Sequence, residues 1–153
     1  MAERNLPDTP MSMIVASLIC VALLTVSLAH FLWAFGRRWP IRDRALLART
    51  VIGRPGVDTM PPWYVSLLIA VVTLACAVFA LALADHDSGG TTMSLIALVP
   101  GVVFLARGIA GYLPAWQRTR PEEPFHTNDL RVYSPLCLIV GIGFIVLALL
   151  RMA

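Results

Sequence analysis

The stretch Met93–Leu113, MSLIALVPGVVFLARGIAGYL, decides the fold class of this chain. As a helix it is long enough to cross the hydrocarbon core of a bilayer, which takes roughly 20 residues. One charged residue, Arg107, interrupts it. A cation near the centre of a membrane helix costs about 2.5–3.5 kcal/mol on insertion scales, so it normally faces protein or water and has a partner. Arg107 therefore predicts a polar site inside a membrane protein.

Composition extends this interpretation to the whole chain. Hydrophobic residues make up 58% of the 153 residues and charged residues only 14%, whereas soluble domains have about 45–50% and about 25%. The apolar residues gather in four runs, 12–35, 63–84, 93–113 and 133–150. Because backbone polar groups in lipid must be satisfied within the segment, these runs predict helices. We expect an all-α fold, an integral membrane four-helix bundle that forms a single transmembrane domain over residues 1–153.

The first run also has to be compared with a cleaved signal peptide. Residues 1–10 carry a net negative charge where a signal peptide has a positive region. The apolar run is longer than the roughly 7–15 residues of a signal core, and Gly36-Arg37-Arg38 ends it like a stop-transfer signal. We therefore expect a retained membrane helix.

The arginines predict the orientation, since the chain has no lysine. Loops 36–62 and 114–132 hold nine of them, whereas the opposite side has only Arg4 and Arg151. The positive-inside rule then puts both loops in the cytoplasm and leaves both termini extracytoplasmic. We expect a multi-pass protein of the cell membrane, in contact with the lipid bilayer. The formal net charge of +3 is explained by this topology, so we expect no nucleic-acid partner.

Small residues recur at helical spacing along all four runs. Lipid provides little hydrophobic drive between helices, so stripes of small residues allow the close approach on which helix packing depends. Small residues are also common in membrane helices in general, but four coinciding stripes favour packing. We predict a compact bundle in which the stripes face other helices and large aliphatic residues face lipid. The stripe of the second run is Ser66, Ala70, Thr73, Ala77, Ala80 and Ala84.

Polar residues from several segments fall at a similar depth, near the cytoplasmic end. Asp129 is the expected partner of Arg107, because an arginine–carboxylate pair can be bidentate and offsets part of the cost of burial. The Tyr133 hydroxyl and His30 are expected as secondary partners. Two interpretations stay open, a structural clamp and a pocket for a ligand headgroup or for proton handling. The candidate polar cluster is His30, Trp33, Arg107, Asp129 and Tyr133.

The same residues carry a resemblance to a known family. Residues 30–36 read HFLWAFG, Arg107-Gly108 lies in the third run, and residues 133–137 read YSPLC. Together, over about residues 15–150, they resemble small bacterial membrane proteins catalogued as domain of unknown function 3995, which show a His-x-x-Trp-Ala-x-Gly segment and a late Tyr-Ser-Pro-Leu-Cys segment. The resemblance implies a multi-pass protein of a bacterial inner membrane and supplies no reaction.

No cofactor or metal is expected. A haem would need a second axial histidine facing His30 inside the bundle, and no other run contains one. The adjacent residues Asp85-His86-Asp87 cannot easily converge on one ion, so we expect a solvated turn there. The cysteines Cys20, Cys76 and Cys137 fall at different depths and form no C-x-x-C motif, which argues against a disulfide or a zinc site.

Two functions remain open. The first is a non-enzymatic binding, accessory or transport-related module, with a lipid or small-molecule ligand and a membrane protein or a second copy of the chain as partners. The second is a membrane enzyme acting on a lipid or isoprenoid-type substrate at the cytoplasmic leaflet, with His30 as general acid/base and Arg107 as anion clamp. The lack of a catalytic motif favours the first. A lipid-shaped cavity opening toward the cluster favours the second, and tight closure of the cluster favours the first.

Overall fold

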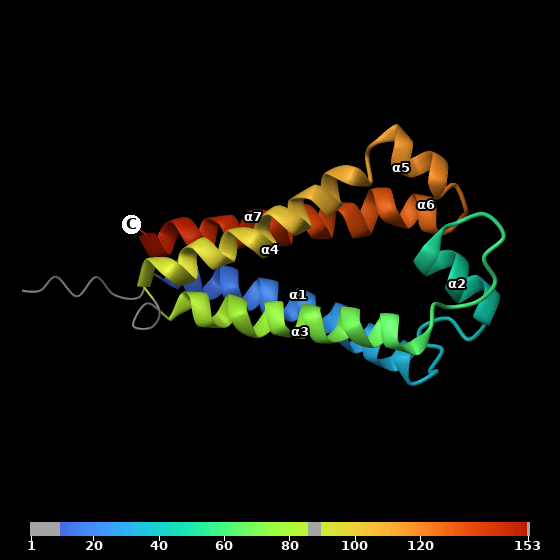
Figure 1. The fold of residues 1–153 in the computed structure, drawn as a ribbon, viewed down its shortest axis with the longest axis horizontal. Coiled ribbons are helices and arrows are strands. Elements are labelled where there is room, and N and C mark those ends of the chain that lie inside the picture. Colours follow the sequence, from blue (N-terminus) through green and yellow to red (C-terminus); the bar gives the residue numbers. More distant parts are fainter. Residues whose placement is uncertain (1–9, 86–89, 153) are drawn as a thin grey trace, which may run out of the picture.

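The computed structural model describes residues 10–85 and 90–152, and within these ranges the chain forms helices and loops without a strand (Figure 1). The expected all-α fold is confirmed. The turn residues His86 and Asp87 and residues 1–9 lie outside the described residues. The long helices are α1 (Pro10–Ala34), α3 (Trp63–Ala84), α4 (Gly90–Ala110) and α7 (Ser134–Met152); the short ones are α2 (Arg44–Ile52), α5 (Pro114–Thr119), α6 (Phe125–Asn128) and a π-helical turn η1 (Asp129–Tyr133).

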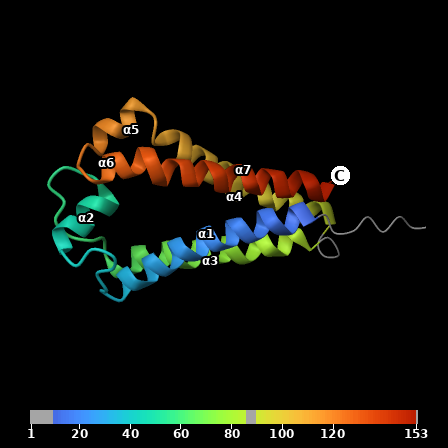
Figure 2. The same ribbon diagram turned by 180° about the vertical axis from the view of Figure 1, so that it is seen from behind.

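The long helices form two pairs. α1 packs along α3, and α4 packs along α7, with less contact between the pairs. Figures 1 and 2 show that the pairs meet at the end where α7 finishes and diverge toward the end that carries α2, α5 and α6. There α2 lies against α6 and bridges the two pairs. The predicted compact packing therefore holds at one end, and the other end is open between the pairs.

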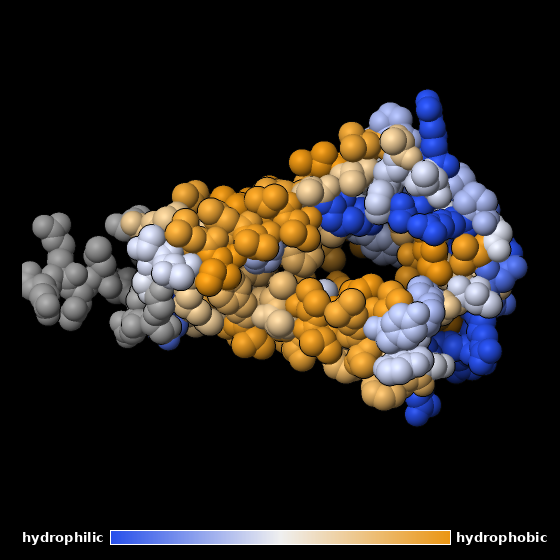
Figure 3. Space-filling model, in the orientation of Figure 1, coloured by the Kyte–Doolittle hydropathy of each residue, from blue (hydrophilic) through white to orange (hydrophobic). Residues whose placement is uncertain are grey.

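Among the described residues, four helical segments are long and apolar enough to cross a membrane, namely Met11–Ala34, Trp63–Ala84, Gly90–Ala110 and Phe125–Met152. On the face shown in Figure 3, apolar residues cover most of the long helices, and hydrophilic residues gather around the open end. The outward-facing residues Leu18, Leu68, Val99 and Ile139 are 63–68% exposed. Soluble proteins rarely expose such large contiguous apolar surfaces. The exterior therefore indicates a membrane protein surrounded by lipid.

The predicted small-residue stripes are buried. All six members of the α3 stripe, from Ser66 to Ala84, are buried. Between α4 and α7, glycines bring the backbones together: a Cβ on Gly141 would lie 2.9 Å from the carbonyl oxygen of Gly101, and one on Gly108 would lie 2.9 Å from the backbone nitrogen of Leu138. Such close approach is the usual way in which membrane helices associate, and the prediction is confirmed.

Stacked aromatic rings and one arginine join the two helix pairs toward the end where the pairs meet, which we call the closed end. The ring of Phe144 on α7 lies 6.4 Å from that of Phe79 on α3 and 6.3 Å from that of Phe104 on α4, both near-parallel. Phe144 therefore joins the two pairs. Near the end of α7, Nη1 of Arg151 donates to the backbone carbonyls of Leu83, at 3.1 Å, and of Asp85. A cation at the C-terminus of a helix also interacts favourably with the helix dipole.

The expected loops contain helices that the apolar runs did not predict. Segment 36–62 holds α2, and segment 114–132 holds α5, α6 and most of η1. Helix α2 begins where Asp43 accepts a hydrogen bond from the backbone N–H of Leu46, 2.9 Å away. The fourth span begins at Phe125 rather than at the expected Tyr133, and α4 ends at Ala110 rather than Leu113. Apolar content alone does not mark these boundaries, because capping and tertiary contacts set them.

Candidate functional site

An ion pair between α4 and η1 lies at the centre of the candidate site. Nη2 of Arg107 donates to Oδ1 of Asp129 over 2.6 Å, and the two side chains are 29% and 4% exposed. Nη1 of Arg107 also reaches the hydroxyl of Ser134, at 3.4 Å. The predicted pairing of Arg107 with Asp129 is therefore confirmed.

Asp129 is satisfied by three side chains. Besides Arg107, its Oδ1 accepts from the Ser134 hydroxyl at 3.2 Å, and its Oδ2 accepts from the indole Nε1 of Trp116 at 2.8 Å. The Trp116 ring also lies beneath two guanidinium groups. Its centroid is 3.6 Å from Cζ of Arg120 and 4.6 Å from Cζ of Arg107. Trp116 thus binds the carboxylate through its indole N–H and contacts both cations through its ring.

Local backbone chemistry brings these side chains together. Pro114 starts α5 at its first position, where a missing N–H costs nothing, and α5 carries Trp116 back toward Asp129. In η1 the N–H of Ser134 reaches the carbonyl of Asp129. This wide turn precedes Pro135, whose ring would clash with a carbonyl four residues earlier in a regular α-helix.

Gly111 leaves room for the ion pair. A Cβ at this position would lie 2.9 Å from Cβ of Ser134 and 3.1 Å from Oδ2 of Asp129. Both distances are shorter than ordinary van der Waals contacts, so a side chain here would displace the carboxylate or the hydroxyl. Glycine at 111 is therefore required by the geometry of the site.

A pocket of about 720 Å³ lies between the two helix pairs, beside the ion pair. Its volume falls within the roughly 300–1,000 Å³ typical of ligand sites. Figure 3 shows an opening between the pairs on one face of the molecule. Much of the wall is apolar, and residues from both pairs and from the bridging segments contribute to it. Apolar lining residues include Val26, Ala29, Val65, Ile69 and Leu136.

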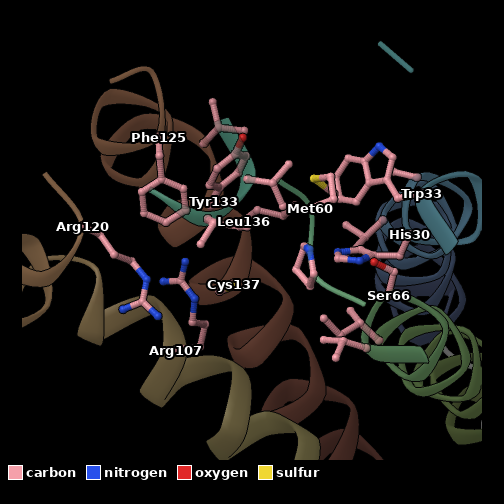
Figure 4. A pocket seen from close by; sticks show the side chains of 18 of the residues that line it. His30, Trp33, Met60, Ser66, Arg107, Arg120, Phe125, Tyr133, Leu136 and Cys137 are labelled. Carbon is pink, nitrogen blue, oxygen red and sulfur yellow. The ribbon is translucent and has the colours of Figure 1, made fainter. Parts of the chain in front are cut away.

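The polar lining residues lie on opposite sides of the pocket. Figure 4 shows the guanidinium groups of Arg107 and Arg120 on one side and the rings of His30 and Trp33 on the other. His30 contacts Trp33 edge to face, with ring centroids 4.7 Å apart, and its Nδ1 is buried without a hydrogen-bond partner among the described residues. The indole of Trp33 donates to the carbonyl of Trp39 over 2.7 Å.

Tyr133 joins the pocket wall to helix α2. Its hydroxyl donates to the backbone carbonyl of Thr50 over 3.2 Å, and its ring lies 5.8 Å from that of Phe125. Phe125 in turn packs against Gly53, the left-handed residue that ends α2. Tyr133 therefore connects η1 to helix α2 at the open end. The expectation that its hydroxyl is a partner of Arg107 was wrong, because the hydroxyl bonds to Thr50 instead.

Positive charge is concentrated at one end of the pocket. The lining residues within the described chain include Arg54, Arg107 and Arg120 but no acidic residue. Burial lowers the pKa of the Arg120 guanidinium from its ordinary value, and the nearby charges of Arg54 and Arg107 lower it further. Arginine nevertheless stays protonated in proteins. The three cations therefore share one region of positive potential, in which Asp129 forms an ion pair with Arg107 and also acts to raise the pKa of Arg120.

Four of the five candidate residues line the pocket, namely His30, Trp33, Arg107 and Tyr133, and Asp129 lies buried behind Arg107. The comparison of polar residues by their depth in the membrane did not predict that Trp116, Arg120 or Arg54 belongs to the site. All three lie in segments that read as loops, and only the folding of α5 and α2 places them at the pocket. Ser134, which bonds to both Arg107 and Asp129, is also outside the predicted cluster, although it lies in the YSPLC segment that carried the family resemblance.

The described residues contain no group of three or more His, Cys, Asp or Glu side chains that could hold a metal ion. Neither a curated protein nor a solved structure matches the chain. A family model does match, over residues 22–144, and the segments 30–36 and 133–137 that suggested the resemblance both lie within this range. Because the match covers most of the chain, the protein belongs to the family described as Protein of unknown function (DUF3995).

Proposed function

We propose that this protein is a non-enzymatic binding module of the cell membrane that takes an amphipathic ligand, a lipid or a lipid-like small molecule, into the pocket between its helix pairs. In this proposal the chain acts as a single transmembrane domain. The open end lies at the cytoplasmic side, where the positive-inside rule directs the arginine-rich loops. The cluster His30, Trp33, Arg107, Asp129 and Tyr133 forms part of the ligand site.

The pocket is the observation that carries this proposal. Helices within each pair pack closely through small residues, yet α1 and α3 diverge from α4 and α7 at one end only. The space between them combines apolar walls with a polar end. Binding sites are typically concave and apolar with a few convergent polar groups. A membrane amphiphile matches both parts, because its chain suits the walls and its headgroup suits the polar end.

Filling the pocket tests the proposal. Ala29 lines the pocket, so Ala29→Phe should occupy space that the ligand needs. Ala106 is exposed on α4 and does not line the pocket, so Ala106→Phe is the matched control. Native mass spectrometry of the purified proteins should detect bound lipid on the wild type and on Ala106→Phe, and much less on Ala29→Phe. Equal lipid binding by all three proteins would contradict the proposal.

A lipid-acting enzyme is the second candidate, and His30 is the observation that favours it. Its imidazole lies in the same pocket with an unpartnered Nδ1, as a general acid/base would. The open pocket beside the cluster also counts toward the enzyme, by the criterion given above, and the lack of a catalytic motif in the sequence keeps the binding module first. Prolonged incubation of the purified protein with membrane lipid extract, followed by lipid mass spectrometry, separates the two. Product formed by the wild type and abolished by His30→Asn would favour the enzyme, and unchanged lipid would favour the binding module.

A further inference from the structure

The arginine end of the pocket has more positive charge than the ion pair needs. Arg107 is balanced by Asp129, whereas Arg54 and Arg120 make no ion pair with a carboxylate of the described residues. Arg120 is also partly buried. Cations at such a position normally have a partner, because removing them from water is costly. Two positive charges are therefore available to a ligand.

We propose that Arg54, Arg107 and Arg120 bind the headgroup of a phosphate monoester amphiphile. This inference rests on the proposed function and names the chemical class of its ligand. The chain of the amphiphile lies against the apolar walls of the pocket, and its phosphate lies at the arginine end. The shared chemistry is a phosphate monoester, carried either by a lipid or by a soluble phosphate.

Charge and shape both favour a phosphate monoester over other headgroups. A monoester carries about −1.5 to −2 charge at pH 7, which matches the two positive charges in excess. A phosphodiester carries one negative charge and leaves the other cation unbalanced. Guanidinium groups also fit phosphate oxygens with paired, parallel hydrogen bonds. A carboxylate headgroup would offer fewer acceptors and a smaller charge.

Trp116 positions Arg107 and Arg120 for phosphate binding. Both guanidinium groups lie over its ring. Figure 4 shows Arg107 and Arg120 on the same side of the pocket. A guanidinium that stacks on an aromatic face keeps the N–H groups at its edge free to donate. Asp129 and Ser134 fix Arg107 from behind. We assign Arg120 as a ligand-contacting residue and the Trp116–Asp129 pair as positioning residues.

Lipid titrations of the purified full chain test this assignment. In native mass spectrometry we compare dioleoyl phosphatidic acid, dioleoyl phosphatidylglycerol and dioleoyl phosphatidylcholine, which share their acyl chains and differ in the headgroup. Inorganic phosphate and glycerol 3-phosphate form separate arms. The variants are Arg120→Gln, Arg120→Lys and, as matched control, Arg118→Gln, since Arg118 is exposed on α5 and does not line the pocket.

The wild type should bind phosphatidic acid at least about tenfold more tightly than phosphatidylcholine, with phosphatidylglycerol between them. Arg120→Gln should weaken phosphatidic acid binding about tenfold, the size expected for the loss of one charge-assisted hydrogen bond. Arg120→Lys should retain part of the preference, because it keeps the charge and loses the planar fork. Arg118→Gln should bind like the wild type. Unchanged melting temperatures of the variants without lipid separate these effects from misfolding.

The remaining outcomes distinguish this inference from the proposed function. If the three lipids bind equally and Ala29→Phe weakens all of them, the phosphate assignment is wrong and the proposed function stands. If phosphate and glycerol 3-phosphate bind with the same dependence on Arg120 and no lipid binds, the phosphate assignment stands and the proposed function fails. If Arg118→Gln and Arg120→Gln reduce phosphatidic acid binding equally, the attraction is a general surface effect and the assignment fails.

Discussion

At the scale of single residues, Asp129 is the most constrained group of the site. It is buried and accepts hydrogen bonds from Arg107, Trp116 and Ser134. Removing one partner of a buried charged pair is costly, because the other charge is left uncompensated. Arg107 and Asp129 should therefore depend strongly on one another. The exposed pair Arg49–Asp58, at 2.8 Å, offers a comparison within the same chain.

We predict a large coupling energy between Arg107 and Asp129. Arg107→Ala and Asp129→Ala should each lower the free energy of unfolding. The double variant should lower it by less than the sum of the two single decreases. The coupling should be about 1–3 kcal/mol, within the range for contacting residues, and chemical denaturation in detergent measures it. The same cycle on Arg49 and Asp58 should give little coupling, because water and salt screen an exposed pair. Additive effects at Arg107 and Asp129 would mean that the pair contributes nothing as a pair.

At the scale of elements, the contact between α1 and α3 depends on small side chains. Ala70, Ala77 and Ala80 are fully buried on α3, and Ala16 is fully buried on α1. Ala75, on the other side of α3, is exposed. A larger side chain therefore has room at position 75 and none at position 77.

We predict that Ala77→Leu destabilises the protein by about 1–3 kcal/mol, the usual cost of overpacking a tight site. Thermal unfolding in detergent, followed by circular dichroism, should show a lower melting temperature. Ala75→Leu adds the same atoms to the surface that faces lipid and should leave the melting temperature unchanged. Equal melting temperatures for the two variants would indicate that the α1–α3 contact is not tight.

The long helices could be predicted from the sequence because their signals are local. The helix over 63–84 can be predicted from apolar content alone, and its stripe of small residues can be predicted from helical spacing alone. The short helices could not be predicted in this way. Helix α2 ends at Gly53, where Phe125 fills the space that a side chain would need, although the two residues are far apart in the sequence.

At the scale of the whole molecule, matching polar residues by their depth in the membrane predicted the ion pair and left the pocket as one of two open interpretations. Arg107 and Asp129 could be matched because each position along a span corresponds to a depth in the membrane. The pocket arises from the absence of packing between the two pairs, and helical periodicity does not encode where neighbouring helices part. Arg54 and Arg120 lie outside the spans, so no apolar pattern linked them to His30 or Arg107.

We predict that both termini lie outside the cytoplasm, because nine arginines lie in segments 36–62 and 114–132. Alkaline phosphatase, which is active only outside the cytoplasm, should be active when fused after Ala153. The same reporter fused after Asp58 should be inactive, and a fluorescent protein should give the reverse pattern at both positions. An active phosphatase after Asp58 would reverse the orientation and place the arginine end of the pocket at the outer leaflet.

If the pocket binds an amphiphile as proposed, the divergence of the two helix pairs has a consequence for how its occupancy is controlled. The opening lies between membrane-length helices, so an amphiphile that enters there moves sideways within its own leaflet and need not dissolve in water first. Its effective concentration is then its mole fraction among the surrounding lipids. Doubling the total lipid at fixed composition should leave occupancy unchanged, whereas doubling the share of the ligand in the bilayer should raise it. The protein would then respond to the composition of its membrane.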